Sequence, residues 1–129
     1  MARSIVATDK APAAIGPYSQ GIIASGKMLF TAGQIALDPD TGEMAPADIG
    51  LQTRQVLKNL SAVLVGGESS LQQVVKVTIY LLDMSDYDLV NEIYTEYFGE
   101  SNPARALVQV SRLPKDALIE MDCVALAGQ

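Results

Sequence analysis

The chain has 129 residues, 49% hydrophobic and 19% charged, and this length and balance predict one folded domain over residues 1–129 with a core of its own. Fifteen acidic residues against nine scattered basic ones give a net charge of −6, which argues against a surface for nucleic acids. Histidine is absent and Cys123 is the single cysteine, so an internal disulfide is excluded and catalysis would use carboxylates, Tyr, Lys, Arg, backbone groups or water.

The first third of the chain predicts three short strands and a long loop. The first strand covers residues 4 to 7. The stretch APAAIGPYSQG, which contains two prolines and two glycines, predicts a loop as far as about Tyr18. Residues 19 to 24 and 28 to 34 then have strand character and are joined by a tight turn at residues 25–27.

A helix and a buried strand are predicted next. Asp48 is the expected N-cap of the helix, and apolar residues follow it at helical spacing. A left-handed cap at Gly66-Gly67 is expected to end the helix. Residues 74 to 82, VVKVTIYLL, form an apolar run rich in β-branched residues, which is typical of a buried central strand.

The last third predicts a second helix and two closing strands. The helix is expected to begin near Ser85, with Asp88 in a capping-box-like pair, and to stop at Gly99. Its expected apolar face is Leu89, Val90, Ile93, Tyr94, Tyr97 and Phe98. Strands are expected over residues 104–110 and 118–126. The order ββ(β)αβαββ predicts an α+β fold with helices on one face of a mixed sheet.

Arg105 and Glu120 stand out because each is a charged residue in an otherwise apolar strand. Period-two alternation places Arg105, Leu107 and Gln109 on one face of their strand. If the two closing strands form a hairpin about residues 112 and 113, Arg105 lies opposite Glu120 on the same side of the sheet. A cross-strand salt bridge would explain this pair. A site in which Arg105 also binds a ligand carboxylate while Glu120 holds a water is the alternative, although the pattern alone favours the salt bridge.

Cys123 is the basis of two predictions, one about the core and one about the cellular compartment. It alternates onto an apolar face with Met121 and Ala125, which predicts a core thiol and not a nucleophile. The lone cysteine, the lack of a signal segment and the lack of a long apolar run predict a reducing, cytoplasmic setting with no membrane partner.

Four segments resemble the RidA (YjgF) family of reactive imine and enamine deaminases. They are APAAIGPYSQG, FTAGQIALDPDTGE, VNEIYTEYF and PARALVQVSRLPKDALIEMDCVALA, in order and at matching spacing over almost the whole chain. The resemblance implies a chorismate-mutase-like α+β fold and a homotrimer with a central barrel-like core and three sites at subunit interfaces. It implies hydrolysis of 2-imino acids, such as those released by serine and threonine dehydratases, to 2-keto acids and ammonia. It implies neither a metal nor an organic cofactor.

The resemblance also assigns residues. Its carboxylate-binding arginine falls on Arg105, its water-positioning glutamate on Glu120, and its loop tyrosine on Tyr18, which another part of the assembly would supply. The remaining substrate-binding positions fall on Asn91, Gly33, Leu107 and Ala32. Many members have Ser in place of Ala32 and Cys in place of Leu107, so the resemblance implies a changed pocket rim and substrate preference.

Three classes of function follow from the sequence. The first is an imine deaminase. The second is a non-catalytic sensor or chaperone module that binds keto acids or amino acids. The third is an endoribonuclease or translation inhibitor, since family members carry those labels. The acidic charge and the lack of histidine argue against the third, and the presence of Glu120 favours catalysis over the second.

Overall fold

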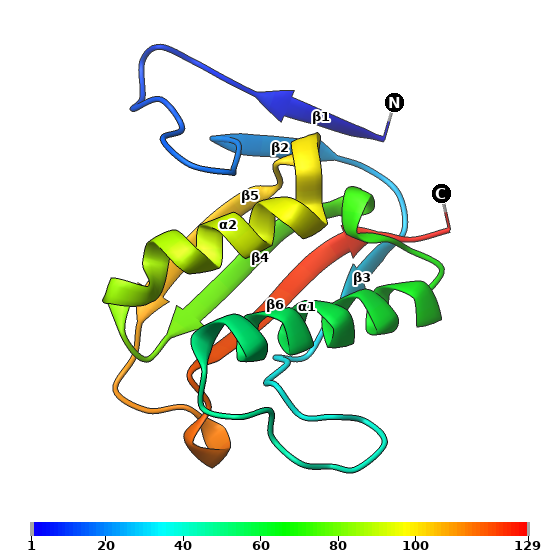
Figure 1. Ribbon diagram of the computed structural model, residues 1–129. Coiled ribbons are helices and arrows are strands. Elements are labelled where there is room, and N and C mark those ends of the chain that lie inside the picture. Colours follow the sequence, from blue (N-terminus) through cyan, green and yellow to red (C-terminus); the bar gives the residue numbers. More distant parts are fainter. Residues whose placement is uncertain (1, 129) are drawn as a thin grey trace.

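Two helices cover one face of a four-stranded mixed sheet in the computed structural model, which describes residues 2–128 (Figure 1). The strand order is β3-β6-β4-β5. These strands are β3 (Met28–Phe30), β6 (Ile119–Leu126), β4 (Val74–Leu81) and β5 (Ala104–Gln109). A separate antiparallel pair, β1 (Arg3–Val6) and β2 (Gly21–Ala24), lies beyond the edge of the sheet that β5 forms (Figure 1). The predicted α+β architecture is therefore confirmed.

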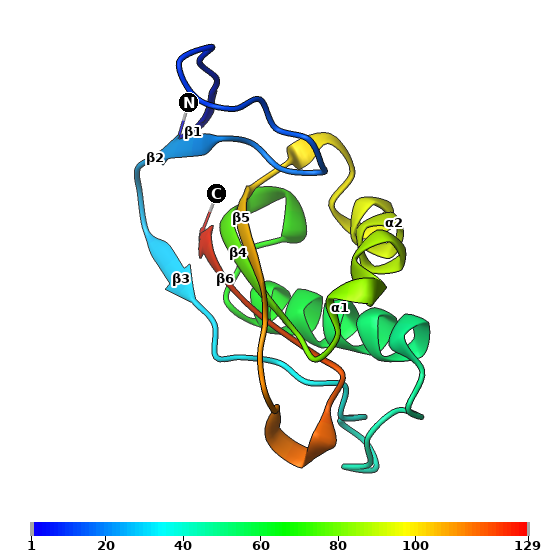
Figure 2. The ribbon, with the colours of Figure 1, turned by 90° about the vertical axis from the view of Figure 1, so that its left-hand side faces the viewer.

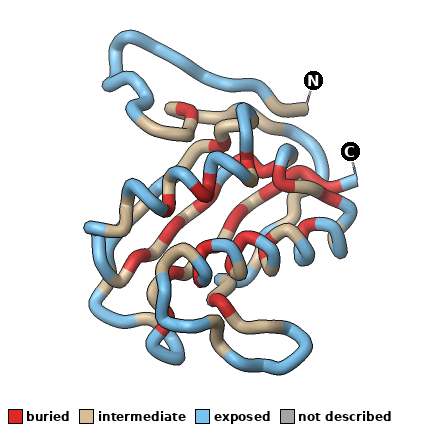
Figure 3. Tube along the Cα trace, in the orientation of Figure 1, coloured by how far each residue is buried: buried red, intermediate tan, exposed pale blue. Residues whose placement is uncertain are grey.

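The core lies between the sheet and the helices. Every second residue of β4 is buried, and Val77, Ile79 and Leu81 are fully buried against the helices. Figure 2 shows both helices on one side of β4, β5 and β6, and Figure 3 shows the buried segments concentrated between these layers. Cys123 on β6 is 2% exposed and belongs to this core, which confirms the prediction of a core thiol.

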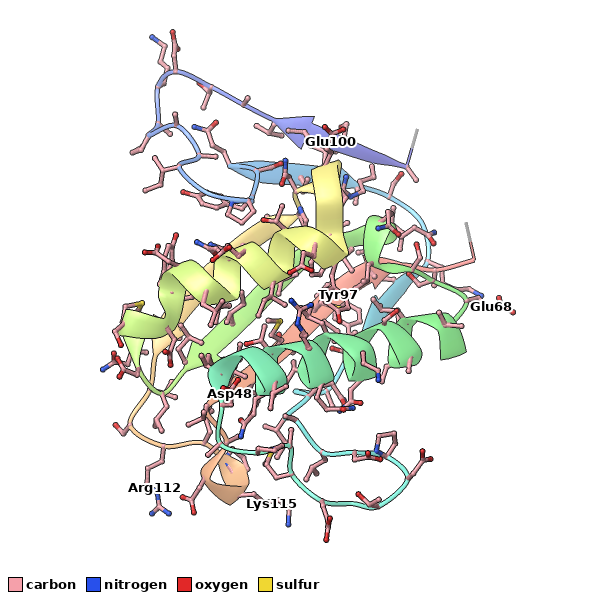
Figure 4. All side chains as sticks on the ribbon, in the orientation of Figure 1. Asp48, Glu68, Tyr97, Glu100, Arg112 and Lys115 are labelled. Carbon is pink, nitrogen blue, oxygen red and sulfur yellow. The ribbon has the colours of Figure 1, made fainter. Side chains whose placement is uncertain are left out.

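The first helix, α1 (Ile49–Gly66), begins as predicted. The Asp48 side chain accepts a hydrogen bond of 2.9 Å from the backbone N–H of Leu51, at the start of the helix in Figure 4. The prediction of a left-handed glycine at its end is wrong, because Gly67 has φ −98° and the left-handed residue is Glu68, with φ +61°. Gly67 packs closely against Leu29, since a Cβ atom there would overlap the Leu29 side chain and force it to move.

The second helix, α2 (Tyr87–Phe98), follows a single 3-10 turn at Met84–Asp86. The predicted pairing of Ser85 with Asp88 is replaced by a cap from Asp83, whose side chain accepts from the N–H of Ser85 at 2.9 Å. The expected stop at Gly99 is confirmed, with φ +57° at that residue. Leu89 was expected on the apolar face but is 42% exposed. None of the helices within residues 2–128 has the length and apolar character needed to cross a bilayer.

Two predicted pairings of strands are wrong. β2 and β3 do not pair with each other, because β2 pairs with β1 and β3 pairs with β6. β5 and β6 do not form a hairpin, because β4 lies between them, parallel to β5 and antiparallel to β6. β6 buries one face along its whole length and so takes a central place, whereas β5, which carries polar residues, is an edge strand.

The order of the strands separates the two residues that the hairpin would have paired. Arg105 lies opposite Val77 of β4, on the face that the helices cover. Glu120 lies opposite Tyr80, on the face away from the helices. Side chains alternate between the two faces along β4, and Val77 and Tyr80 are three positions apart, so they point to opposite faces. Arg105 and Glu120, which lie opposite them, therefore also point to opposite faces of the sheet.

Candidate functional site

Arg105 extends from β5 toward α2 and is surrounded by polar and aromatic side chains. Its Nη1 donates a hydrogen bond of 2.7 Å to Oδ1 of Asn91, and its Nη2 donates a longer one of 3.5 Å to the Tyr87 hydroxyl. The guanidinium carbon lies 5.0 Å from the ring centre of Tyr94, 5.5 Å from that of Tyr18 and 5.9 Å from that of Tyr87. These distances fall within the range for cation–π attraction.

The spacing of residues on α2 explains this arrangement. Tyr87, Asn91 and Tyr94 are separated by four and three residues, so they lie on one face of the helix. That face lies over the edge strand β5 at Arg105. Apolar periodicity placed Tyr94 only on an apolar face, and no sequence pattern had singled out Tyr87. The spacing of these two tyrosines about Asn91 is the signal that could have identified them.

The guanidinium of Arg105 retains hydrogen-bond donors for a ligand. An arginine has five N–H donors, and here one makes a short bond and a second makes a long bond. Within residues 2–128 the single ion pair joins Arg54 to Glu96, 2.9 Å apart, so the salt bridge proposed between Arg105 and Glu120 is absent. A half-buried cation without a carboxylate partner is suited to bind an anion, above all a carboxylate that matches its planar fork.

Tyr94 closes the inner side of this site. Its side chain is fully buried, and its hydroxyl has no hydrogen-bond partner among the described residues. Burial raises the pKa of Tyr94, and the positive charge of Arg105 opposes that shift in part. The hydroxyl therefore stays protonated, and the ring acts as an apolar support behind the guanidinium.

Tyr18 lies against Arg105 within the same chain, whereas the family resemblance had suggested that another part of the assembly supplies it. Its neighbour Ser19 holds the loop to the segment that leads into β5. The Ser19 hydroxyl donates to the carbonyl of Asn102 at 2.6 Å, and its N–H donates to the carbonyl of Pro103 at 3.3 Å. The chain thus brings Tyr18 to Arg105 by anchoring the residue next to it.

Glu120 forms a second cluster with Gly33 on the other face of the sheet. A Cβ atom at Gly33 would overlap the Glu120 carboxylate, so a larger residue here would displace that carboxylate from its present position. Hydrogen bonds of 2.8 and 3.1 Å between the backbones of Gln34 and Met121, the residues that follow Gly33 and Glu120, hold the two segments together. Ala32 lies beside Gly33, and both are exposed. Among residues 2–128, no cluster of His, Cys, Asp or Glu could hold a metal ion.

Residues 8–127 match the sequence profile of the family described as Endoribonuclease L-PSP. The chain belongs to this family. It is 54% identical to a RutC family protein of Pyrococcus abyssi, over 97% of this chain and 98% of that protein. It is 42% identical to the 2-iminobutanoate/2-iminopropanoate deaminase of Mus musculus, over 98% and 93% of the two chains. The crystal structure of the YjgF gene product of E. coli is similar, with a TM-score of 0.73, 44% identity and coverage of 95% and 98%. The resemblance to the RidA/YjgF family is thereby confirmed.

In this RidA/YjgF family chain, the predicted site residues fall into two groups. Tyr18 and Asn91 lie against Arg105, and Gly33 lies against Glu120. Leu107 shares the helix-facing side of β5 with Arg105, and its half-buried side chain packs against the core. One chain therefore contains a cation half-site around Arg105 and a carboxylate half-site around Glu120, on opposite faces of the sheet.

Proposed function

We propose that this RidA/YjgF family chain hydrolyses small 2-imino acids, and the enamines that interconvert with them, to 2-keto acids and ammonia. The observation that carries the proposal is the guanidinium of Arg105, which has unused donors and no carboxylate partner among residues 2–128. A 2-imino acid supplies the planar carboxylate that such a group binds. The name of the mouse relative, 2-iminobutanoate/2-iminopropanoate deaminase, supports the same reaction.

The reaction needs little beyond positioning, because an imine carbon is already electrophilic. Arg105 holds the carboxylate, and the Glu120 carboxylate orients a water and accepts its proton as the oxygen bonds to C2. The proton then passes to the nitrogen and gives a carbinolamine. As the carbonyl forms, the hydroxyl proton also moves to the nitrogen, the C–N bond breaks, and ammonia leaves. The proposed step uses no metal and no organic cofactor.

A second copy of the chain would complete this site. Arg105 and Glu120 lie on opposite faces of one sheet, so a ligand held by Arg105 would need the carboxylate of another chain. The face away from the helices also exposes Phe30 at 74% and Val108 at 43%, which suits burial against another copy. We therefore propose a homotrimer with a central barrel-like core and three sites between subunits.

An imine-trapping assay tests the proposed reaction. An L-amino acid oxidase generates the 2-imino acid in the presence of semicarbazide, which reacts with the free imine. The chain is expected to lower the rate of semicarbazone formation by hydrolysing the imine first, and Arg105→Ala is expected to abolish this effect. Arg112→Ala, at an exposed arginine of a loop, is the matched control and should behave like the natural chain. No decrease in semicarbazone formation at any concentration of the natural chain would refute the proposal.

The sensor alternative has one observation in its favour. The half-site around Arg105 is assembled within one chain, so it could bind a 2-keto acid without Glu120. Calorimetry with 2-oxobutanoate separates the two functions. Binding that depends on Arg105, without acceleration of imine hydrolysis, would favour the sensor over the enzyme.

A further inference from the structure

The loop that carries Tyr18 has little backbone structure of its own. It connects β1 to β2, and the pairing of these strands ends at Val6 and Gly21. Between those residues, one backbone hydrogen bond lies within the loop, from the N–H of Tyr18 to the carbonyl of Gly16 at 2.8 Å. Other contacts must therefore fix its shape.

One side chain, Gln20, supplies most of these contacts. Its Oε1 accepts from the N–H of Thr8 at 2.6 Å. Its Nε2 donates to the carbonyls of Thr8 at 3.0 Å, Pro12 at 2.6 Å and Ala11 at 3.3 Å. The two N–H groups of the Gln20 amide thus serve three carbonyls. Gln20 stands two positions after Tyr18, so this single amide ties residues 8–12 at the start of the loop to its end.

Tyr18 depends on the loop from both directions. On one side, Ser19 anchors the chain to Asn102 and Pro103, just before β5. On the other side, the loop returns onto the tyrosine, since the N–H of Ile15 donates to the Tyr18 hydroxyl at 3.3 Å. If the loop loses its shape, the ring loses this second contact and its place over Arg105.

We infer that Gln20 is a positioning residue, which holds the loop of residues 7–20 so that the Tyr18 ring covers the cation half-site at Arg105. The inference rests on the proposed function, because it assigns the covered site to a 2-imino acid. Gln20 does not contact the half-site and acts through Tyr18.

Glutamine is the residue type that meets this pattern of bonds. The site requires one acceptor and two donors from a single planar group, which a glutamine amide provides. Glutamate has the same shape but only accepts, so in Gln20→Glu a carboxylate would face three carbonyl oxygens. The loop should then open, while Arg105, Asn91 and Glu120 keep their own contacts. The expected effect is weaker retention of the substrate with little change in the chemical step.

The test combines a structural and a kinetic measurement on the full chain. Tyrosine is labelled with 13C, and NMR detects the contact between the Tyr18 ring and the Arg105 side chain. Gln20→Glu and Gln20→Ala should both lose this contact. Gln72→Glu is the matched control, because Gln72 is an exposed glutamine whose side chain makes no hydrogen bond among residues 2–128, and it should keep the contact. The melting temperatures of all variants establish that they are folded.

A double-mutant cycle gives the kinetic measurement. Gln20→Glu should raise KM about tenfold and leave kcat within about twofold when Tyr18 is present, and should change neither when Tyr18→Ala is already in place. Retention of the contact between Tyr18 and Arg105 in Gln20→Glu, or equal losses with and without Tyr18, would overturn the inference. If the natural chain hydrolyses no imine, the proposed function fails, and the NMR measurement still decides whether Gln20 positions Tyr18.

Discussion

Two inactive variants of this chain should restore activity when they are mixed. The prediction follows from the positions of Arg105 and Glu120 on opposite faces of the sheet, which prevent one chain from bringing both residues to one ligand. Arg105→Ala chains keep an intact carboxylate half-site, and Glu120→Ala chains keep an intact cation half-site. A subunit interface contains a complete site when the Glu120→Ala chain supplies the arginine and the Arg105→Ala chain supplies the glutamate.

The magnitude follows from random assembly. In trimers formed from equal amounts of the two variants, a site is complete when its arginine and its glutamate each come from the correct kind of chain. Each choice has a probability of one half, so about a quarter of all sites should be active. Each variant alone should have almost none.

Refolding the two variants together provides the assay, with imine hydrolysis followed by semicarbazide trapping. The matched control mixes Arg105→Ala with Asn91→Leu, which damage the same half-site and should not complement each other. If the first mixture is no more active than the sum of its separate components, the two half-sites do not meet between chains and the proposed assembly is wrong.

Three further predictions concern single residues. Gly33→Ala places a methyl group on the Glu120 carboxylate, so kcat should fall about tenfold or more. Calorimetry should show that binding of 2-oxobutanoate is unchanged. A kcat equal to that of the natural chain would show that the position of Gly33 against Glu120 does not affect the reaction. Asn91→Leu removes the 2.7 Å bond to Arg105 and should raise KM at least about tenfold, since a hydrogen bond to a charged group contributes about 1.5–3 kcal/mol. An unchanged KM would show that Arg105 is positioned without this bond. Burial raises the pKa of the Cys123 thiol to about 11 from 9.0, so its contribution to stability is present below pH 9 and is lost as pH rises through 11. Urea unfolding from pH 8 to 11 should show this loss in the natural chain and a smaller one in Cys123→Ala.

Local features of the fold could be predicted from the sequence because short-range chemistry determines them. The N-cap at Asp48, the buried strand at Val74–Leu81 and the stop at Gly99 each depend on residues within one turn or one strand. The cap at Asp83 was missed, because a 3-10 turn at Met84–Asp86 precedes α2. The capping bond is therefore made at the start of that turn, between Asp83 and Ser85, and not at the start of α2.

The pairing of β5 and β6 could not be obtained in this way. Two consecutive strands joined by a short turn usually form a hairpin, and alternation alone gave a self-consistent register for Arg105 and Glu120. The strand order depends instead on which strands bury a full face under the helices, and that is a property of the whole sheet.

In the candidate site, too, the residue types could be predicted from the sequence, but their arrangement depends on the whole sheet. The family resemblance identified Arg105, Glu120, Tyr18 and Asn91 as site residues, and the structure brings three of these four together. The separation of Glu120 from the others follows from the sheet topology, which motif spacing does not encode.

The proposed hydrolysis is tested most directly by the rate of 2-keto acid formation in a threonine dehydratase reaction to which this chain is added in catalytic amounts. We expect faster release of 2-oxobutanoate with the natural chain, and the uncatalysed rate with Arg105→Ala or Glu120→Gln. An unchanged rate with the natural chain, or full acceleration by Arg105→Ala, would contradict it.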